Sequence, residues 1–216
     1  MAYTVLIPAR LASTRLPNKP LVDIGGLPMV VRVAERVKAG LSADVRVVVA
    51  ADDASILSAC QAHGIECLLT RVDHPSGSDR LAEACSLLGL ADDDIVVNVQ
   101  GDEPLLNGDI LKELADFHSQ SKFDMGTLIR PRSTKDEEFL NPNVVKAVFS
   151  QESQRCLYFS RASLPYSRDK ITDYTWYQHI GVYSYKAHAL QAFVKLPESH
   201  LEKMERLEQL RALENG

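Results

Sequence analysis

Short apolar runs alternate with stretches in which apolar residues recur every three or four positions along the first half of the chain. The runs are rich in β-branched residues and predict buried strands at residues 3–7, 45–50, 65–69 and 95–100. The periodic stretches are each followed by a glycine and predict helices at residues 28–39, 53–63 and 79–88. This alternation indicates an α/β fold with a mainly parallel sheet flanked by helices, whose ligands bind at the carboxyl ends of the strands.

The pattern changes near residue 120, where irregular polar stretches begin to separate the apolar runs. Additional mixed strands are expected in this second half at residues 125–129, 144–149, 157–160 and 180–185. Residues 131–143 are expected to form a long loop. Because no flexible linker separates the two halves, a single domain over residues 1–216 is expected.

A last helix is predicted near the end of the chain. Its apolar stripe is formed by Leu201, Met204, Leu207 and Leu210. Glu202 and Arg206 are spaced for an ion pair four residues apart on that helix. The stripe predicts a face packed in the core rather than a cofactor site.

Composition and charge narrow the class of protein. The 216 residues are 45% hydrophobic and 25% charged, which is typical of a globular protein. A formal net charge of −5 disfavours nucleic acid as the main partner, so local positive charge is expected to hold a small anion. The four cysteines have neither CxxC nor zinc-ligand spacing, which favours reduced thiols. Since there is no signal-peptide pattern and no membrane-spanning apolar run, a cytoplasmic protein without membrane insertion is expected.

A cluster of cations follows the first predicted strand directly, in residues 8–21, which we call the phosphate loop. Arg10, Arg15 and Lys19 lie within ten positions, and Arg and Lys are the side chains that bind phosphate oxygens. The loop has neither Gly-Lys-Ser/Thr at a helix start nor G-x-G-x-x-G after the strand, so it belongs to neither common glycine-rich type. A solvated basic loop is the alternative, but the position after a buried strand favours phosphate binding.

Two carboxylates, Asp102 and Glu103, follow the strand predicted at residues 95–100. Asp102 is the better ligand candidate because Gly101 lets the backbone turn beside it, although an Asp that caps its own turn is the alternative. Mg²⁺ is often held by one or two carboxylates together with substrate phosphates. With the phosphate loop at the same edge of the sheet, this pattern predicts a site for a nucleoside triphosphate and a metal ion.

A third polar segment, residues 70–80, follows the strand at residues 65–69 and leads into a helix. Ser78 or Asp79 is expected to cap that helix. The functional alternative is a second loop over the ligand, whose hydroxyl and N–H groups contact a base. His74 alone favours a structural or surface role over acid–base chemistry.

Together these segments resemble one family closely, the 3-deoxy-manno-octulosonate (Kdo) cytidylyltransferases. The resemblance extends from the first strand almost to the last residue and rests on residues 7–10, 13–17, 19–21, 73–74, 76–77, 80–83, 97–104, 141–143, 158–161, 179–183 and 207–211. The phosphate loop alone is shared more loosely with other sugar nucleotidyltransferases, and the later segments narrow the resemblance to Kdo. It implies a Rossmann-like nucleotidyltransferase sheet, a nucleotide-binding half at about residues 1–120, and a sugar-binding and dimerising half at about 121–216.

The resemblance also implies a reaction, in which CTP and Kdo give CMP-Kdo and pyrophosphate for lipopolysaccharide synthesis. It implies Mg²⁺ as the cofactor and a homodimer, with neither nucleic acid nor membrane as a partner. By the same resemblance, the catalytic residues are Arg10, Arg15 and Lys19, which hold the CTP phosphates, and Asp102, which ligates the metal.

Further binding residues are implied by the resemblance alone. The nucleotide pocket would also be lined by Ala9, Arg71, Ser76, Gly77 and Gln100. The sugar acid would be held by Gln100, Arg161, His179, Tyr183, Glu208 and Gln209. The alternative for the sugar residues is a purely structural or surface role, since Tyr183 could pack in the core and Glu208 could be a surface charge.

The sequence departs from the family pattern at its end. The family continues past residues 210–216 with a Gly-Val-Asp type segment, whose Asp supplies a second carboxylate to the metal, and this chain stops before it. A chain that ends at Gly216 is therefore expected to bind magnesium weakly or not at all. The alternatives to a Kdo enzyme are a cytidylyltransferase for another acidic sugar and a truncated nucleotide-binding module without catalysis.

Overall fold

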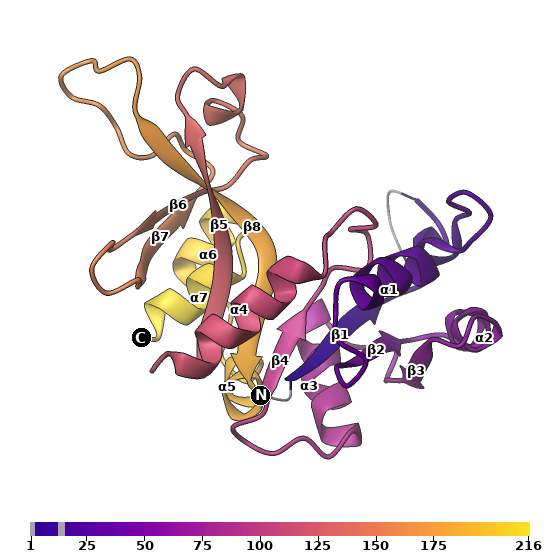
Figure 1. Ribbon diagram of the computed structural model, residues 1–216. Coiled ribbons are helices and arrows are strands. Elements are labelled where there is room, and N and C mark those ends of the chain that lie inside the picture. Colours follow the sequence, from indigo (N-terminus) through magenta and orange to yellow (C-terminus); the bar gives the residue numbers. More distant parts are fainter. Residues whose placement is uncertain (1–2, 13–15) are drawn as a thin grey trace. The chain divides into compact units, whose positions relative to one another are not determined.

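The computed structural model describes residues 3–12 and 16–216 (Figure 1). Internal contacts divide the chain into two compact units. The first unit comprises Met1–Gly126 and Val182–Val194, and the second comprises Thr127–Gly181 and Lys195–Gly216. Whether the two units form the single domain expected from the sequence stays a prediction.

The sheet of the first unit contains four parallel strands in the order β3, β2, β1 and β4. Their bounds are Glu66–Leu69 for β3, Arg46–Ala51 for β2, Tyr3–Ala9 for β1 and Ile95–Asn98 for β4. The end of β8 (Thr175–Lys186) joins β4 as an antiparallel strand, with Tyr183 opposite Asn98. The predicted fold class, a mainly parallel sheet flanked by helices, is confirmed.

Buried β-branched residues explain the central strands. Val5 and Ile7 of β1 and Val48 and Val49 of β2 have no exposed surface, as expected for parallel strands covered on both faces. One face packs on α3 (Gly77–Leu87) and α5 (Ala187–Phe193). The remaining helices of this unit are α1 (Met29–Ala39), α2 (Ala54–Ala62) and α4 (Asp109–Gln120).

Two helices of the first unit are absent from the elements predicted above. Helix α4 buries Leu111, Leu114, Ala115 and His118, which have the i, i+3, i+4, i+7 spacing of an amphipathic helix, so the signal was present in the sequence. Helix α5 has only seven residues and follows β8 directly. Such a short helix carries too few turns for periodicity to separate it from the end of a strand.

The second unit contains β6 (Lys146–Phe149) and β7 (Cys156–Ser160), which pair with each other and with the start of β8 in antiparallel fashion. Strand β5 (Met125–Ser133) also pairs with β8. The predicted loop at residues 131–143 contains the end of β5 and the short 3-10 helix η2 (Glu137–Phe139). One core cluster of this unit contains Ala147, Phe159, Leu207 and Leu210, and Trp176 is also fully buried.

The predicted last helix is wrong as a single element. The chain forms α6 (His200–Glu205) and α7 (Gln209–Glu214), separated at Arg206, whose φ of 52° is left-handed. Met204 is 72% exposed and does not belong to the core. The predicted pair between Glu202 and Arg206 is also absent, because Glu202 binds Arg211 through two hydrogen bonds of 2.8 and 2.6 Å.

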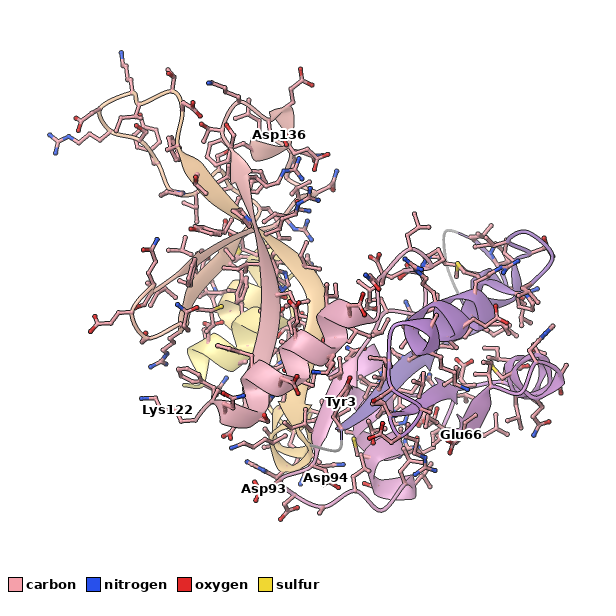
Figure 2. The ribbon with its side chains drawn as sticks, viewed as in Figure 1. Tyr3, Glu66, Asp93, Asp94, Lys122 and Asp136 are labelled. Atoms are coloured by element: carbon pink, nitrogen blue, oxygen red, sulfur yellow. The ribbon has the colours of Figure 1, made fainter. Side chains whose placement is uncertain are left out.

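None of the described helices is both long enough and apolar enough to cross a bilayer. The four cysteines are free thiols. Figure 2 shows Asp93 and Asp94 in the loop before β4, and both are exposed. Tyr3 and Glu66, labelled in the same view, mark the amino ends of β1 and β3.

Candidate active site

The carboxyl ends of β1 and β4 bring a cation and a carboxylate together. Lys19 begins the short 3-10 helix η1 (Lys19–Leu21), and its Nζ contacts Oδ2 of Asp102, which lies in the turn after β4. The two side chains are 36% and 46% exposed, so their ion pair contributes little to folding. Both groups are therefore accessible to a ligand at the edge where open α/β sheets bind their substrates.

A glycine is required at position 101 because the backbone of β1 lies very close to it. A Cβ atom at Gly101 would lie 2.8 Å from the carbonyl oxygen of Pro8. The turn after β4 therefore lies directly against the end of β1, which sets Asp102 beside the phosphate loop. The sequence identified this glycine for a turn, and the structure adds the neighbouring backbone as the reason.

The other predicted residues at these strand ends differ in exposure. Ala9 is the last residue of β1 and is buried, whereas Arg10 and Gln100 are exposed. Arg15 lies outside the described residues, so its predicted phosphate contact is untested. Ala9, Arg10 and Gln100 thus lie at the carboxyl edge of the sheet, and their binding roles remain predictions.

The segment after β3, residues 70–76, we call the base loop. Its side chains are held by internal pairs, since Arg71 binds both carboxylate oxygens of Asp73 at 2.9 and 2.7 Å. Glu83 of α3 accepts the N–H group of Arg71 at 2.9 Å and contacts Nε2 of His74. His74 therefore has a structural partner, in line with the interpretation from the sequence.

The helix after the base loop is capped two to three residues earlier than predicted. Helix α3 begins at Gly77, and Ser76 rather than Ser78 or Asp79 is its N-cap. Oγ of Ser76 accepts the N–H group of Asp79 at 3.2 Å and donates to its carboxylate at 2.6 Å. Ser76 and Gly77 thus stand at the positive end of an 11-residue helix, where an anion is stabilised.

The carboxyl edge of the sheet carries both positive and negative side chains. Burial and the neighbouring charge of Asp102 raise the pKa of Glu103 above its ordinary value, and Lys19 opposes that shift. Among the described residues, no group of three or more His, Cys, Asp or Glu side chains is arranged to hold a metal ion. A metal at Asp102 would therefore need ligands from a bound phosphate, which suits Mg²⁺.

Four of the predicted sugar residues lie in the second unit. His179 accepts or donates a hydrogen bond with Thr127 at 3.0 Å, and Nε2 of Gln209 lies 3.5 Å from its Nδ1. Burial lowers the pKa of His179 to about 4, so its ring is neutral at pH 7. Glu208 precedes α7 and lies 3.7 Å from Arg211.

Arg161 is engaged with the backbone of the same unit. Its guanidinium donates to the carbonyl oxygens of Glu205 at 2.6 Å and Pro142 at 3.0 Å, with a longer contact of 3.4 Å to that of Arg206. Tyr183, like Gln100, is a predicted sugar residue in the first unit, where it packs against the core that contains Tyr185. This packing fits the core alternative for the partly buried Tyr183, and its contact with the sugar stays a prediction.

A parallel sheet with a cation and a carboxylate at adjoining strand ends is the arrangement of a nucleotide-binding α/β transferase, and the family model described as cytidylyltransferase matches residues 4–216. Similar chains named 3-deoxy-manno-octulosonate cytidylyltransferase are known from Acidovorax sp. (strain JS42), 54% identical over 99% of this chain and 86% of the relative, and from Leptothrix cholodnii, 52% identical over 100% and 81%. The chain belongs to this family of 3-deoxy-manno-octulosonate cytidylyltransferases. The resemblance seen in its motifs is thereby confirmed.

Solved structures with a similar fold agree with this family assignment. A CMP:2-keto-3-deoxy-manno-octonic acid synthetase complexed with CTP has a TM-score of 0.88 and 40% identity, over 100% of this chain and 86% of that one. A cytidylyltransferase from Leptospira borgpetersenii, with a TM-score of 0.59 and 16% identity over 99% of this chain and 72% of that one, supports the fold alone.

Proposed function

We propose that the chain transfers the cytidylyl group of CTP to 3-deoxy-manno-octulosonate, giving CMP-Kdo and pyrophosphate. Membership of the family supports this reaction, since the relatives are named for Kdo and the solved neighbour was complexed with CTP. The observation that carries the proposal in this chain is the meeting of Lys19 and Asp102 at the carboxyl edge of the sheet. That pair offers a donor to phosphate oxygens and an oxygen ligand to a cation.

The chemistry requires no covalent intermediate. The anomeric hydroxyl of the sugar attacks the α-phosphorus in line, a new P–O bond forms, and the bond to the β-phosphate breaks, so that pyrophosphate leaves and the hydroxyl proton passes to solvent. Arg10, Arg15 and Lys19 would hold the phosphates and stabilise charge on the leaving oxygens. Ala9, Arg71, Ser76, Gly77 and Gln100 would fix the nucleoside, so that alignment contributes much of the rate.

Asp102 is the residue that would hold magnesium. Its carboxylate is exposed at the strand edge and has Lys19 as its only partner among the interactions of the described residues. Such a lone carboxylate fits a cation that takes its other ligands from substrate phosphates and water. When bound, Mg²⁺ supplies neutralisation of charge on the phosphate oxygens.

The sugar acid would be held by His179, Glu208 and Gln209, together with Arg161, Tyr183 and Gln100. His179 would act as a neutral hydrogen-bonding group, because burial keeps its pKa near 4. Arg161 would contribute its charge and the N–H donors that the backbone carbonyls leave unused. These roles rest on the family resemblance and on the chemistry of a polyhydroxylated carboxylate.

We further propose that the protein is a homodimer, that it acts in the cytoplasm, and that its product feeds lipopolysaccharide synthesis. Free cysteines suit a reducing compartment, which also supplies CTP. These statements follow from the family and from chemical compatibility.

The test is an assay of pyrophosphate release with CTP, Mg²⁺ and a panel of acidic sugars, beside calorimetry with CTP. Turnover with Kdo and markedly slower turnover with sialic acid or an amino-substituted Kdo is the expected result. Equal turnover of all sugars would replace the Kdo assignment by a broader one. CTP binding without turnover of any sugar would favour the non-catalytic module instead.

A further inference from the structure

A buried ion pair lies below the two loops assigned to the nucleotide. Arg80 of α3 and Asp52, which follows β2, have side chains that are 3% and 9% exposed, with Nη2 and Oδ2 3.4 Å apart. The pair formed by Lys19 and Asp102 is far more exposed. Burying two charges is costly unless further hydrogen bonds satisfy them, so their remaining partners decide what the pair does.

Asp52 holds the start of the phosphate loop on both sides of Arg10. Its backbone N–H donates to the carbonyl oxygen of Ala9 at 3.3 Å, and its Oδ1 accepts the N–H group of Leu11 at 2.8 Å. The backbone that carries Arg10 is therefore fixed from the end of the neighbouring strand. The side chain of Arg10 is left exposed at the strand edge.

Arg80 holds the start of the base loop. Its Nη1 donates to Oγ1 of Thr70 and to the carbonyl oxygen of Arg71, the latter at 3.1 Å. The hydroxyl of Thr70 in turn donates to the carbonyl oxygen of Ala51 at 2.9 Å. One guanidinium thus ties the first two residues of the base loop to the end of β2.

The pair also neutralises charge close to the cationic site. Burial lowers the pKa of Arg80, Asp52 and Glu83 oppose that shift, and the charge of Arg10 adds to it. Arg80 and Arg10 therefore feel each other's charge. Asp52 offsets the buried cation, which leaves the field at the strand edge to the exposed cations.

We propose that Asp52 and Arg80 are positioning residues for the nucleotide, which lock the phosphate loop at Arg10 and the base loop at Arg71 into one rigid frame. They act through the loop backbones and do not contact CTP. This inference rests on the proposed function, because it takes the two loops as the CTP site. Preorganised loops lose less conformational entropy on binding, so the pair strengthens CTP binding.

The test compares Asp52→Asn and Thr70→Val with two matched variants. Asp52→Asn keeps the shape and the acceptor for Leu11 but removes the charge that Arg80 faces, and Thr70→Val removes the hydroxyl between Arg80 and Ala51. Thr70→Ser keeps that hydroxyl. Arg46→Met breaks the ion pair with Glu66, which joins β2 to β3 at their amino ends, away from both loops.

Calorimetry with CTP and steady-state kinetics are carried out on each variant of the 216-residue chain, after circular dichroism has shown that it is folded. We expect Asp52→Asn and Thr70→Val to raise the dissociation constant and the KM for CTP by about ten-fold. The KM for the sugar acid should stay within about two-fold, because a loss confined to one substrate is the mark of lost positioning rather than general damage. Thr70→Ser should recover most of the loss, and Arg46→Met should bind CTP like the parent.

Parent-like CTP affinity in both Asp52→Asn and Thr70→Val would overturn the inference while leaving the proposed function intact. An equal loss in Arg46→Met would also overturn it, since it would then reflect general destabilisation. If Asp52→Asn does not fold, Thr70→Val and Thr70→Ser decide the question alone. A parent chain that fails to bind CTP would remove the proposed function, and the inference with it.

Discussion

Lys19 and Asp102 illustrate how two exposed residues can carry a site without contributing to the fold. Their pair is solvated and screened, so neither side chain is needed for stability. In the free protein each charge satisfies the other, and a triphosphate would offer Lys19 a stronger anionic partner. Binding of a nucleotide should therefore release Asp102 for a cation.

We expect Lys19→Met to remain folded and to weaken CTP binding. Loss of one charged hydrogen bond to phosphate costs about 2 kcal/mol, which is about thirty-fold in the dissociation constant measured by calorimetry. Lys112→Met is the matched control, because Lys112 pairs with Asp116 on the exposed face of α4. CTP affinity in Lys19→Met equal to that of the control would remove Lys19 from the phosphate site.

At the scale of elements, the site depends on how closely the turn after β4 approaches β1. A methyl group at Gly101 would lie 2.8 Å from the carbonyl oxygen of Pro8 and would push the turn outward. Gly101→Ala should therefore cost roughly 1–3 kcal/mol of unfolding free energy and also weaken CTP binding by about ten-fold, since Asp102 moves with the turn.

Gly40→Ala separates these two effects. A methyl group at Gly40 would lie 2.7 Å from Cα of Gly108, so this variant should lose a similar free energy of unfolding. The CTP affinity of Gly40→Ala should equal that of the parent, because Gly40 and Gly108 belong to neither the phosphate loop nor the base loop. Urea unfolding and calorimetry on both variants provide the measurements, and an unchanged affinity in Gly101→Ala would detach the turn from nucleotide binding.

With the exception of α4, elements with a strong local signal were predicted well, and those set by tertiary contacts were not. Strands β1 and β2 follow from β-branched runs that are buried on both faces. The break between α6 and α7 has no such signal, because Leu201, Leu207 and Leu210 keep the spacing of one helix. It arises at Arg206, where a left-handed residue turns the chain so that Glu202 meets Arg211.

For the whole molecule, the sequence pointed to exposed charged residues at the strand edge more readily than to the buried residues that hold the adjoining loops. Arg10, Lys19 and Asp102 were found because charged residues after buried strands mark the binding edge of a sheet. Asp52 and Arg80 were not selected, because their pairing joins positions 28 residues apart and depends on burial, which local patterns do not encode. The support of a site is thus a property of the folded chain.

Global stability should depend on pH through His179. Its pKa is about 4 in the fold and close to 6.5 in the unfolded chain, so the folded state binds the proton less readily. The neutral ring therefore contributes stability that is fully present above pH 6.5 and is lost as the pH falls from 6.5 towards 4. Between pH 7.5 and 5, the parent should lose about 2 kcal/mol of unfolding free energy through this group.

His179→Gln, which cannot be protonated in this range, should show a correspondingly smaller loss in urea unfolding, whereas His63→Gln, at an exposed histidine, should behave like the parent. Equal losses in the parent and in His179→Gln would mean that the ring is not held neutral by burial, and that a charged histidine is available at the proposed sugar site.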